Sequence, residues 1–86
     1  MIVARVTGHV WATRRVDGMP SGALLDVQVE DTGAHFIALD TLGSGLGERV
    51  LIAQGSVAAS WFTGPPPPID ALVIGSIDEA GSAPPH

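Results

Sequence analysis

Apolar and polar residues alternate along the start of the chain, which is the pattern of a strand with one buried face. On this basis residues 2–13 are predicted to form one long strand. Its inner face would carry only small or aliphatic residues: Ile2, Ala4, Val6, Gly8, Val10 and Ala12. A glycine on that face favours a bulge or a sharp bend, which a small barrel needs in order to close. We therefore expect this strand to bend at Gly8.

Four further strands are predicted along the rest of the chain. They cover residues 23–30, 35–39, 49–54 and 69–77. The last of them is almost continuously apolar, as expected of a strand that is covered on both faces. Turn-forming residues separate the strands, at Asp17-Gly18, at 31–33 and in the glycine-rich segment 43–47.

One short helix is predicted between the last two strands. Ser56 is placed to cap a helix over residues 57–62, and Gly64 would end it. Short strands, frequent turns and one short helix predict an all-β fold, a small five-stranded OB-like β-barrel. We expect residues 1–78 to form this barrel and residues 79–86 to form a flexible tail.

The composition indicates that the barrel is only marginally stable alone. A chain of 86 residues buries only about 60% of the surface that its unfolded form exposes. It has no cysteine, so disulfides and thiolate metal sites are excluded. Hydrophobic residues make up 45% of the chain and charged residues only 15%, which favours burial of apolar surface against another subunit. No apolar run approaches a membrane-spanning length, and no secretory signal is visible.

The charge argues against nucleic acid as a partner. The net charge is −5, and the basic residues are Arg5, Arg14, Arg15 and Arg49. Nucleic-acid binding needs clustered basic residues, and the pair Arg14-Arg15 is better explained as a solvated turn. An OB barrel could in principle stack bases on Trp11 or Trp61, but core or subunit contact is the favoured role of both tryptophans.

Three candidate chemical sites are weak in the sequence. The segment 43–47 lacks the spacing of a dinucleotide-binding loop, and the chain has no lysine for a Walker-type loop. The histidines do not stand at a metal-ligand spacing. The Gly-x-Ser-x-Gly motif of hydrolases is absent. We therefore expect no cofactor, no metal and no catalysis. Asp40, Asp70 and Asp78 are expected to bind backbone amides at turns or to pair with Arg49.

Three segments resemble the EutN/CcmL-type family of bacterial microcompartment vertex proteins, which occur in carboxysomes and catabolic compartments. Residues 6–15 (VTGHVWATRR) are similar to the family's opening Val-x-Gly-x-Val-x-Ala-Thr pattern. Residues 40–56 (DTLGSGLGERVLIAQGS) resemble its most specific motif, Asp-x-x-Gly-Ala-Gly-x-Gly-acid-x-Val-Leu-x-x-x-Gly-Ser. Residues 68–78 resemble its closing strand. Order and spacing agree from residue 2 to residue 78.

The chain departs from the family pattern at a few positions. Ser44 stands where alanine is common, Arg15 where lysine is common, and Ala59 where an arginine usually follows the Gly-Ser pair. Any contact that the family makes through that guanidinium is therefore in doubt here. The proline run at 65–68 is also unusual.

The resemblance implies a structural protein of the microcompartment shell, located in the cytoplasm, which forms cyclic pentamers at the shell vertices and is not an enzyme. Its partners would be further copies of itself and the hexameric and trimeric shell proteins, with neither nucleic acid nor membrane as a partner. The alternative is an OB-fold binding module for single-stranded nucleic acid or a protein partner.

Three groups of candidate site residues go with this interpretation. The resemblance implies that the glycine loop lies near the pentamer axis: Gly43, Ser44, Gly45, Leu46 and Gly47. At or near the subunit contacts we expect Trp11, which is on the outer face of the first strand, together with Glu48 and Arg49. At the rim that meets the neighbouring shell tiles we expect Gly55, Ser56, Ile77 and Asp78.

Overall fold

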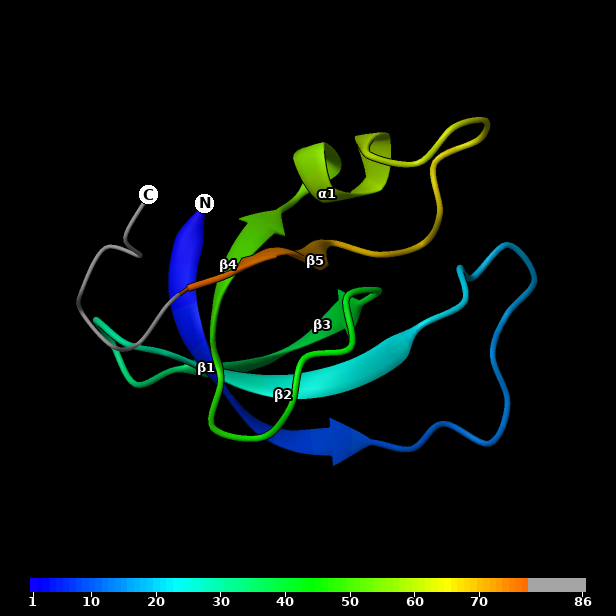
Figure 1. Ribbon diagram of the computed structural model, residues 1–86. Helices are drawn as coiled ribbons and strands as arrows, with labels where there is room; N and C mark the ends of the chain where they lie inside the picture. Colours follow the sequence, from blue (N-terminus) through cyan, green and yellow to red (C-terminus); the bar gives the residue numbers. More distant parts are fainter. Residues whose placement is uncertain (78–86) are drawn as a thin grey trace, which may run out of the picture.

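The structure, a computed structural model, describes residues 1–77, so the predicted tail and Asp78 lie outside the described residues. Within these residues the elements are β1 (Ile2–Val10), β2 (Ala23–Val29), β3 (His35–Asp40), β4 (Arg49–Gln54), α1 (Ser56–Ser60) and β5 (Ala71–Ser76). The strands close into a barrel in the order β1-β2-β3-β5-β4 (Figure 1). The predicted five-stranded, all-β barrel with one short helix is confirmed.

The long strand β1 is shared between two neighbours. Its first half pairs antiparallel with β4, from Ile2 opposite Ile52, and its second half pairs antiparallel with β2. The register to β2 shifts between Val6 and Gly8. The predicted bend is therefore present, and the extra residue of the bulge is Thr7. Such a bulge increases the local twist, which allows one strand to pair with both β2 and β4.

The barrel closes where β3 meets β5. These two strands run parallel and are paired at Leu39 and Leu72, whereas β4 and β5 form a longer antiparallel pair. Parallel neighbours need a long crossover connection. The segment from β4 through α1 and the proline run provides it, and α1 lies over the β4–β5 end of the barrel (Figure 1).

The inward faces of the strands form the main core. Ala4 and Val6 of β1 are buried there, as the alternation predicted. The buried residues of this core are Ala4, Val6, Leu25, Val27, Ala38, Val50, Ile52, Ala71 and Val73. Full burial of one valine, leucine or isoleucine side chain contributes about 1.5–3 kcal/mol to the stability of the folded state.

A second, smaller core lies beneath α1. Leu39, Ala53, Ala58 and Leu72 are buried together there. Ala71 and Val73 of β5 face the main core, while Leu72 between them faces this second cluster. The prediction that the last strand is covered on both faces is thus confirmed for its first half. The helix is stable because it packs on the barrel, since so short a helix is not stable alone.

Several predicted boundaries were wrong. The first strand ends at Val10 rather than at residue 13, because its last partner in β2 is Leu24 and no strand faces residues 11–13. The last strand begins at Ala71 rather than at residue 69. The helix ends at Ser60, and its N-cap is Gly55, with a φ of 66° and no side-chain cap, so Ser56 is the first helical residue.

Candidate functional site

The glycine loop, residues 43–47, is anchored at its start by Asp40. This carboxylate is 2% exposed, and it accepts hydrogen bonds from the backbone amides of Leu42 (3.2 Å), Gly43 (3.0 Å) and Ser44 (2.8 Å). The Ser44 hydroxyl also donates to it, at 3.1 Å. The prediction that Asp40 binds backbone amides at a turn is therefore confirmed. Gly43 has a φ of +83°, a backbone conformation that a residue with a side chain would adopt only with strain.

The end of the loop is tied to β1 and β5. The amide of Gly47 donates to the carbonyl of Val6 at 2.8 Å. The Glu48 carboxylate accepts from the amide of Gly45 at 3.3 Å and from the hydroxyl of Ser76 at 2.8 Å. Both ends of the loop are thus fixed to the barrel, so its shape is set within a single chain.

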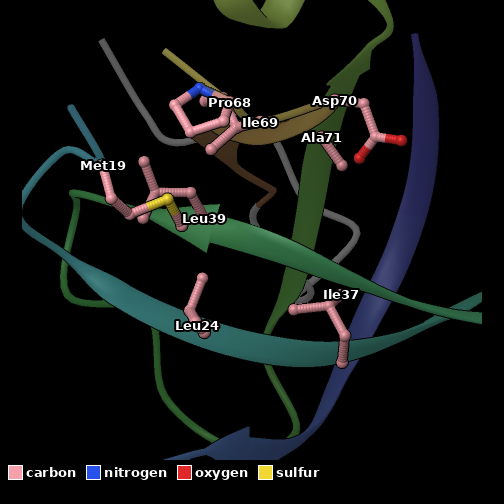
Figure 2. A pocket seen from close by; sticks show the side chains of 8 residues that line it. All are labelled: Met19, Leu24, Ile37, Leu39, Pro68, Ile69, Asp70 and Ala71. Atoms are coloured by element: carbon pink, nitrogen blue, oxygen red, sulfur yellow. The ribbon is translucent and has the colours of Figure 1, made fainter. Parts of the chain in front are cut away.

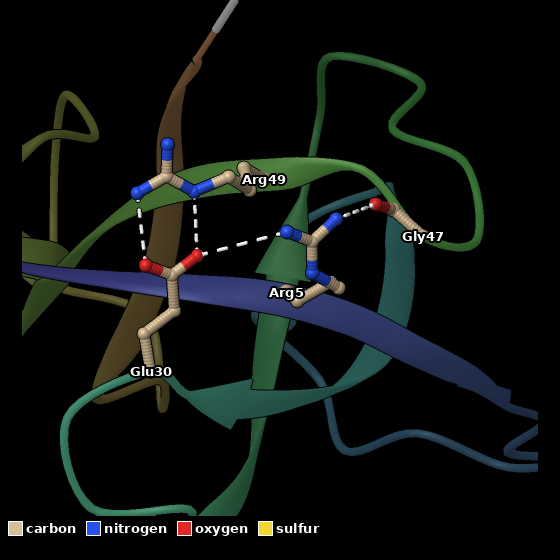
Figure 3. A network of polar contacts seen from close by, with 4 residues as sticks. All are labelled: Arg5, Glu30, Gly47 and Arg49. Carbon is tan, nitrogen blue, oxygen red and sulfur yellow. Dashed lines mark hydrogen bonds and ion pairs between the residues drawn. The ribbon is translucent and has the colours of Figure 1, made fainter. Parts of the chain in front are cut away.

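Polar contacts extend from the loop across the strand surface (Figure 3). Arg5 donates to the carbonyl of Gly47 at 2.6 Å, and its guanidinium also lies 3.9 Å from the carboxylate of Glu30. Arg49 forms a two-point contact with the same carboxylate, at 2.5 and 2.8 Å. Glu30, which was not among the predicted partners of Arg49, is thus an acid that Arg49 pairs with. Bidentate pairs of this kind fix orientation as well as adding energy.

Trp11 lies just beyond the end of β1 and is 85% exposed. Its ring stacks against His9, with the ring centroids 5.6 Å apart and the planes at 22°. The stack orients the indole without covering it. A tryptophan this exposed is typical of a protein contact surface, where aromatic residues supply much of the binding energy.

The residues expected to meet the shell tiles do not form one patch. Gly55 and Ser56 follow the end of β4, where the amide of Gly55 donates to the carbonyl of Asp70 at 2.7 Å. Ile77 lies at the other end of β4, where its amide donates to the carbonyl of Arg49 at 2.9 Å. A strand of six residues separates them by roughly 20 Å. Asp78 lies outside the described residues.

A polar cluster that sequence reasoning missed lies on the outer face of β1–β3. The hydroxyl of Thr7 donates to the Asp26 carboxylate at 2.7 Å, and Nδ1 of His35 lies 3.0 Å from the same oxygen. The Thr7 hydrogen bond, and then the interactions with His35, lower the pKa of Asp26 against the opposing effect of desolvation. The three residues are far apart in the chain, and only the register brings them together.

An apolar hollow also escaped prediction. It lies between the outer surface of β2 and β3 and the segment that enters β5 (Figure 2). Its lining comes from distant parts of the chain: Met19, Leu24, Ile37, Leu39, Pro68, Ile69, Asp70 and Ala71. The alternation of residues within one strand cannot predict this hollow, because the hollow forms only when the connecting segments pack against the barrel.

Residues 1–77 hold neither a candidate metal site nor a candidate membrane-spanning helix. No three histidine, aspartate or glutamate residues are grouped there as a metal ion would require. No helix of this part of the chain is long and apolar enough to cross a membrane.

A small closed barrel with a rigid loop and exposed tryptophans has the features of a subunit in a larger structural assembly. The family model described as "Ethanolamine utilisation protein EutN/carboxysome" matches residues 1–78. The chain therefore belongs to the EutN/CcmL family.

Curated relatives span nearly the whole chain. The shell vertex protein PduN of Salmonella typhimurium is 34% identical, over 91% of this chain and 96% of its own length. The carboxysome shell vertex protein CcmL of Thermosynechococcus vestitus is 36% identical, over 91% and 84%. These relatives support the shell function over the alternative of a binding module.

Solved structures agree with the family assignment. The pentameric shell protein of the RMM microcompartment is 65% identical, superimposes with a TM-score of 0.89 and is covered over the full length of both chains. The pentameric shell protein GrpN of Rhodospirillum rubrum is 30% identical with a TM-score of 0.79, over 96% of this chain and all of its own. The chain is a structural vertex protein of a bacterial microcompartment shell.

Proposed function

We propose that the chain forms a homopentamer at the shell vertices through Trp11, Glu48 and Arg49, with the glycine loop 43–47 around the five-fold axis. The observation that carries this proposal is the 85% exposure of Trp11. A ring held in one orientation and left uncovered is suited to insert into a neighbouring subunit. Pentameric relatives such as GrpN support five-fold assembly.

A cyclic pentamer uses two different patches of each subunit, one facing each neighbour. Trp11 lies just beyond the C-terminal end of β1, whereas Arg49 begins β4 and is paired with Arg5 in the middle of β1. The two are therefore separated along the barrel surface, as two distinct patches require. Arg49 keeps its bond to Glu30, and the pair would present a fixed polar surface to the next subunit.

The outer edge of the pentamer would meet hexameric and trimeric shell proteins. Flat sheets of such tiles do not close a polyhedron without pentagons at the vertices. Gly55 and Ser56 would form one tile contact. Ile77, which lies at the other end of β4, would form a second one together with Asp78. We propose neither nucleic acid nor membrane as a partner, since the net charge of −5 opposes anionic surfaces.

We further propose that the chain has no catalytic activity of its own. Its relatives are structural shell proteins. The serine and carboxylate that approach each other in the glycine loop, Ser44 and Asp40, are bonded to each other and to backbone amides. Their arrangement serves the shape of the loop rather than nucleophilic attack.

The first test is the solution mass by light scattering coupled to size exclusion. We expect five times the 8.8 kDa of one chain. Trp11→Ala is expected to shift the mass toward monomer, because the main aromatic contact is lost. Val57→Ala is the control, since Val57 is also apolar and exposed, at 66%, and should leave the mass unchanged. A wild-type monomer at high concentration, or a pentamer that survives Trp11→Ala, would contradict this assignment.

A further inference from the structure

The glycine loop exposes an apolar side chain at its centre. Leu46 is 65% exposed and stands between Gly45 and Gly47, which have no side chains to cover it. Residues 41–47 contain no charged residue. A single exposed leucine needs no explanation on its own. Here, however, the leucine belongs to a segment whose shape is fixed at both ends.

The bonds that fix the loop hold Leu46 in place. Ser44 is bound to Asp40 through its amide and its hydroxyl. Gly47 is bound to Val6 through its amide and to Arg5 through its carbonyl. Leu46 therefore projects from a rigid support rather than from a mobile loop. An exposed side chain that is already held in one position loses little conformational freedom when a partner binds it. Leu46 is therefore suited to a contact with another molecule.

The charged groups next to the loop are bonded within the chain. Asp40 is buried under the loop amides. Glu48 accepts from Gly45 and Ser76, and Arg5 donates to Gly47. The side chain of Leu46 is therefore the apolar part of the surface that the loop offers to a neighbour, and the charged groups beside it are neutralised or bonded within the chain. An identical apolar surface is a suitable partner for it.

We propose that five Leu46 side chains, one from each subunit, meet on the five-fold axis and close it with an apolar plug. The proposal rests on the proposed function, which places the loop 43–47 around the axis. A ring of leucines contains no group that can replace the hydration shell of an ion, and hydrophobic constrictions of this kind close pores by excluding water. The occupant of the axis is thus the chain itself, in five copies.

Cysteine crosslinking tests whether Leu46 converges on the axis. The natural chain has no cysteine, so Leu46→Cys introduces one thiol per subunit. A short bifunctional thiol reagent should convert at most about four fifths of the chains to dimers on a denaturing gel, because five thiols around one axis can form only two bridges. Val57→Cys is the control, since Val57 is 66% exposed on α1, and should stay monomeric on the gel.

A charge substitution tests whether the contact is apolar and mutual. Leu46→Asp would bring five carboxylates together, so we expect loss of the pentamer at low salt and its partial recovery at about 1 M salt, where repulsion is screened. Val57→Asp should keep the pentamer at every salt concentration. Circular dichroism of each variant checks that the barrel is folded, which the exposure of Leu46 predicts.

The outcomes separate this proposal from the one on which it rests. A wild-type monomer would overturn the pentamer itself. A wild-type pentamer in which Leu46→Cys does not crosslink, or in which Leu46→Asp is indifferent to salt, would leave the pentamer intact and overturn the plug.

Discussion

The backbone at Gly22 passes very close to β3. Gly22 has a φ of +144°, and a Cβ built there would lie 2.6 Å from the carbonyl oxygen of Asp40 and 3.3 Å from a methyl group of Leu39. A backbone carbonyl at the end of a paired strand has little freedom to move away. Glycine at this position therefore allows the loop before β2 to pack against the end of β3, next to the turn that Asp40 holds.

Gly22→Ala should destabilise the protein by about 1–3 kcal/mol, through the clash and the unfavourable φ together. Urea unfolding at one protein concentration measures this as a lower midpoint with an unchanged slope. Gly8→Ala is the control, because a Cβ there would lie 3.9 Å from the Cβ of Asp26, an ordinary van der Waals distance, and should not lower stability by more than about 0.5 kcal/mol. Equal midpoints for the two variants would contradict the close approach.

At the scale of elements, the β1 bulge places a side chain as well as bending the strand. Thr7 is the extra residue of the bulge, and its hydroxyl reaches both the carbonyl and the carboxylate of Asp26 on β2, at 3.0 and 2.7 Å. The bulge is thus bound to its neighbouring strand by the interaction that contributes most to the lowered pKa of Asp26. Strand geometry and titration are coupled at this point.

The sign of the pH dependence follows from that lowered pKa. The folded state favours ionised Asp26, so this stability is present above the unfolded pKa of about 3.8 and is lost as the pH falls through the lower folded pKa. Thr7→Val removes the largest cause. The variant should therefore be less stable than wild type at neutral pH. The difference in the free energy of unfolding between the two proteins should shrink below pH 3.8.

Urea midpoints measured from neutral to strongly acidic pH check this prediction. Thr13→Val is the control, since Thr13 is exposed and lies beyond the end of β1, and its midpoints should follow wild type throughout. A Thr7→Val deficit of the same size at every pH would show that the hydroxyl supports packing and does not act through the charge of Asp26.

Most elements could be predicted because their causes are local. Alternation within one strand predicted the buried faces of β1 and β2, and Gly8 indicated the bulge. The end of β1 could not be predicted in this way, since residues 11–13 continue the alternation and only the lack of a partner stops the strand. The predicted helix start was wrong because the prediction placed the N-cap at Ser56. The N-cap is Gly55, which turns the chain into the helix through its positive φ.

At the scale of the whole molecule, the candidate site was partly predictable. The short-range contacts of the glycine loop, such as Asp40 with Ser44, follow from residues four positions apart. The partner of Arg49 could not be predicted in this way. Glu30 is nineteen residues away in the chain, and the two side chains meet only when the barrel has closed. The same limit applies to the two proposed tile contacts, which were expected to belong to one rim and whose described residues lie at opposite ends of β4.

The separation of these contacts allows the tile assignment to be tested at one of them alone. Ser56 is exposed and is the first residue of α1. The helix α1 lies on the side of the barrel away from the turn between β2 and β3 (Figure 1). Ser56→Arg should leave the solution mass unchanged but prevent co-assembly with the hexameric shell protein of the same compartment, because a long charged side chain blocks a close contact. Electron microscopy should then show open sheets or tubes in place of closed shells.

Ala34→Arg is the matched control, since Ala34 is exposed in the turn between β2 and β3. It adds the same charge and volume and should permit closed shells. Closed shells with Ser56→Arg would remove this end of β4 from the tile contact and leave the Ile77 end as the contact to test. Failure with both substitutions would instead show that added positive charge alone opposes assembly. The control therefore separates a local contact from a property of the whole surface, whose net charge of −5 either substitution reduces equally.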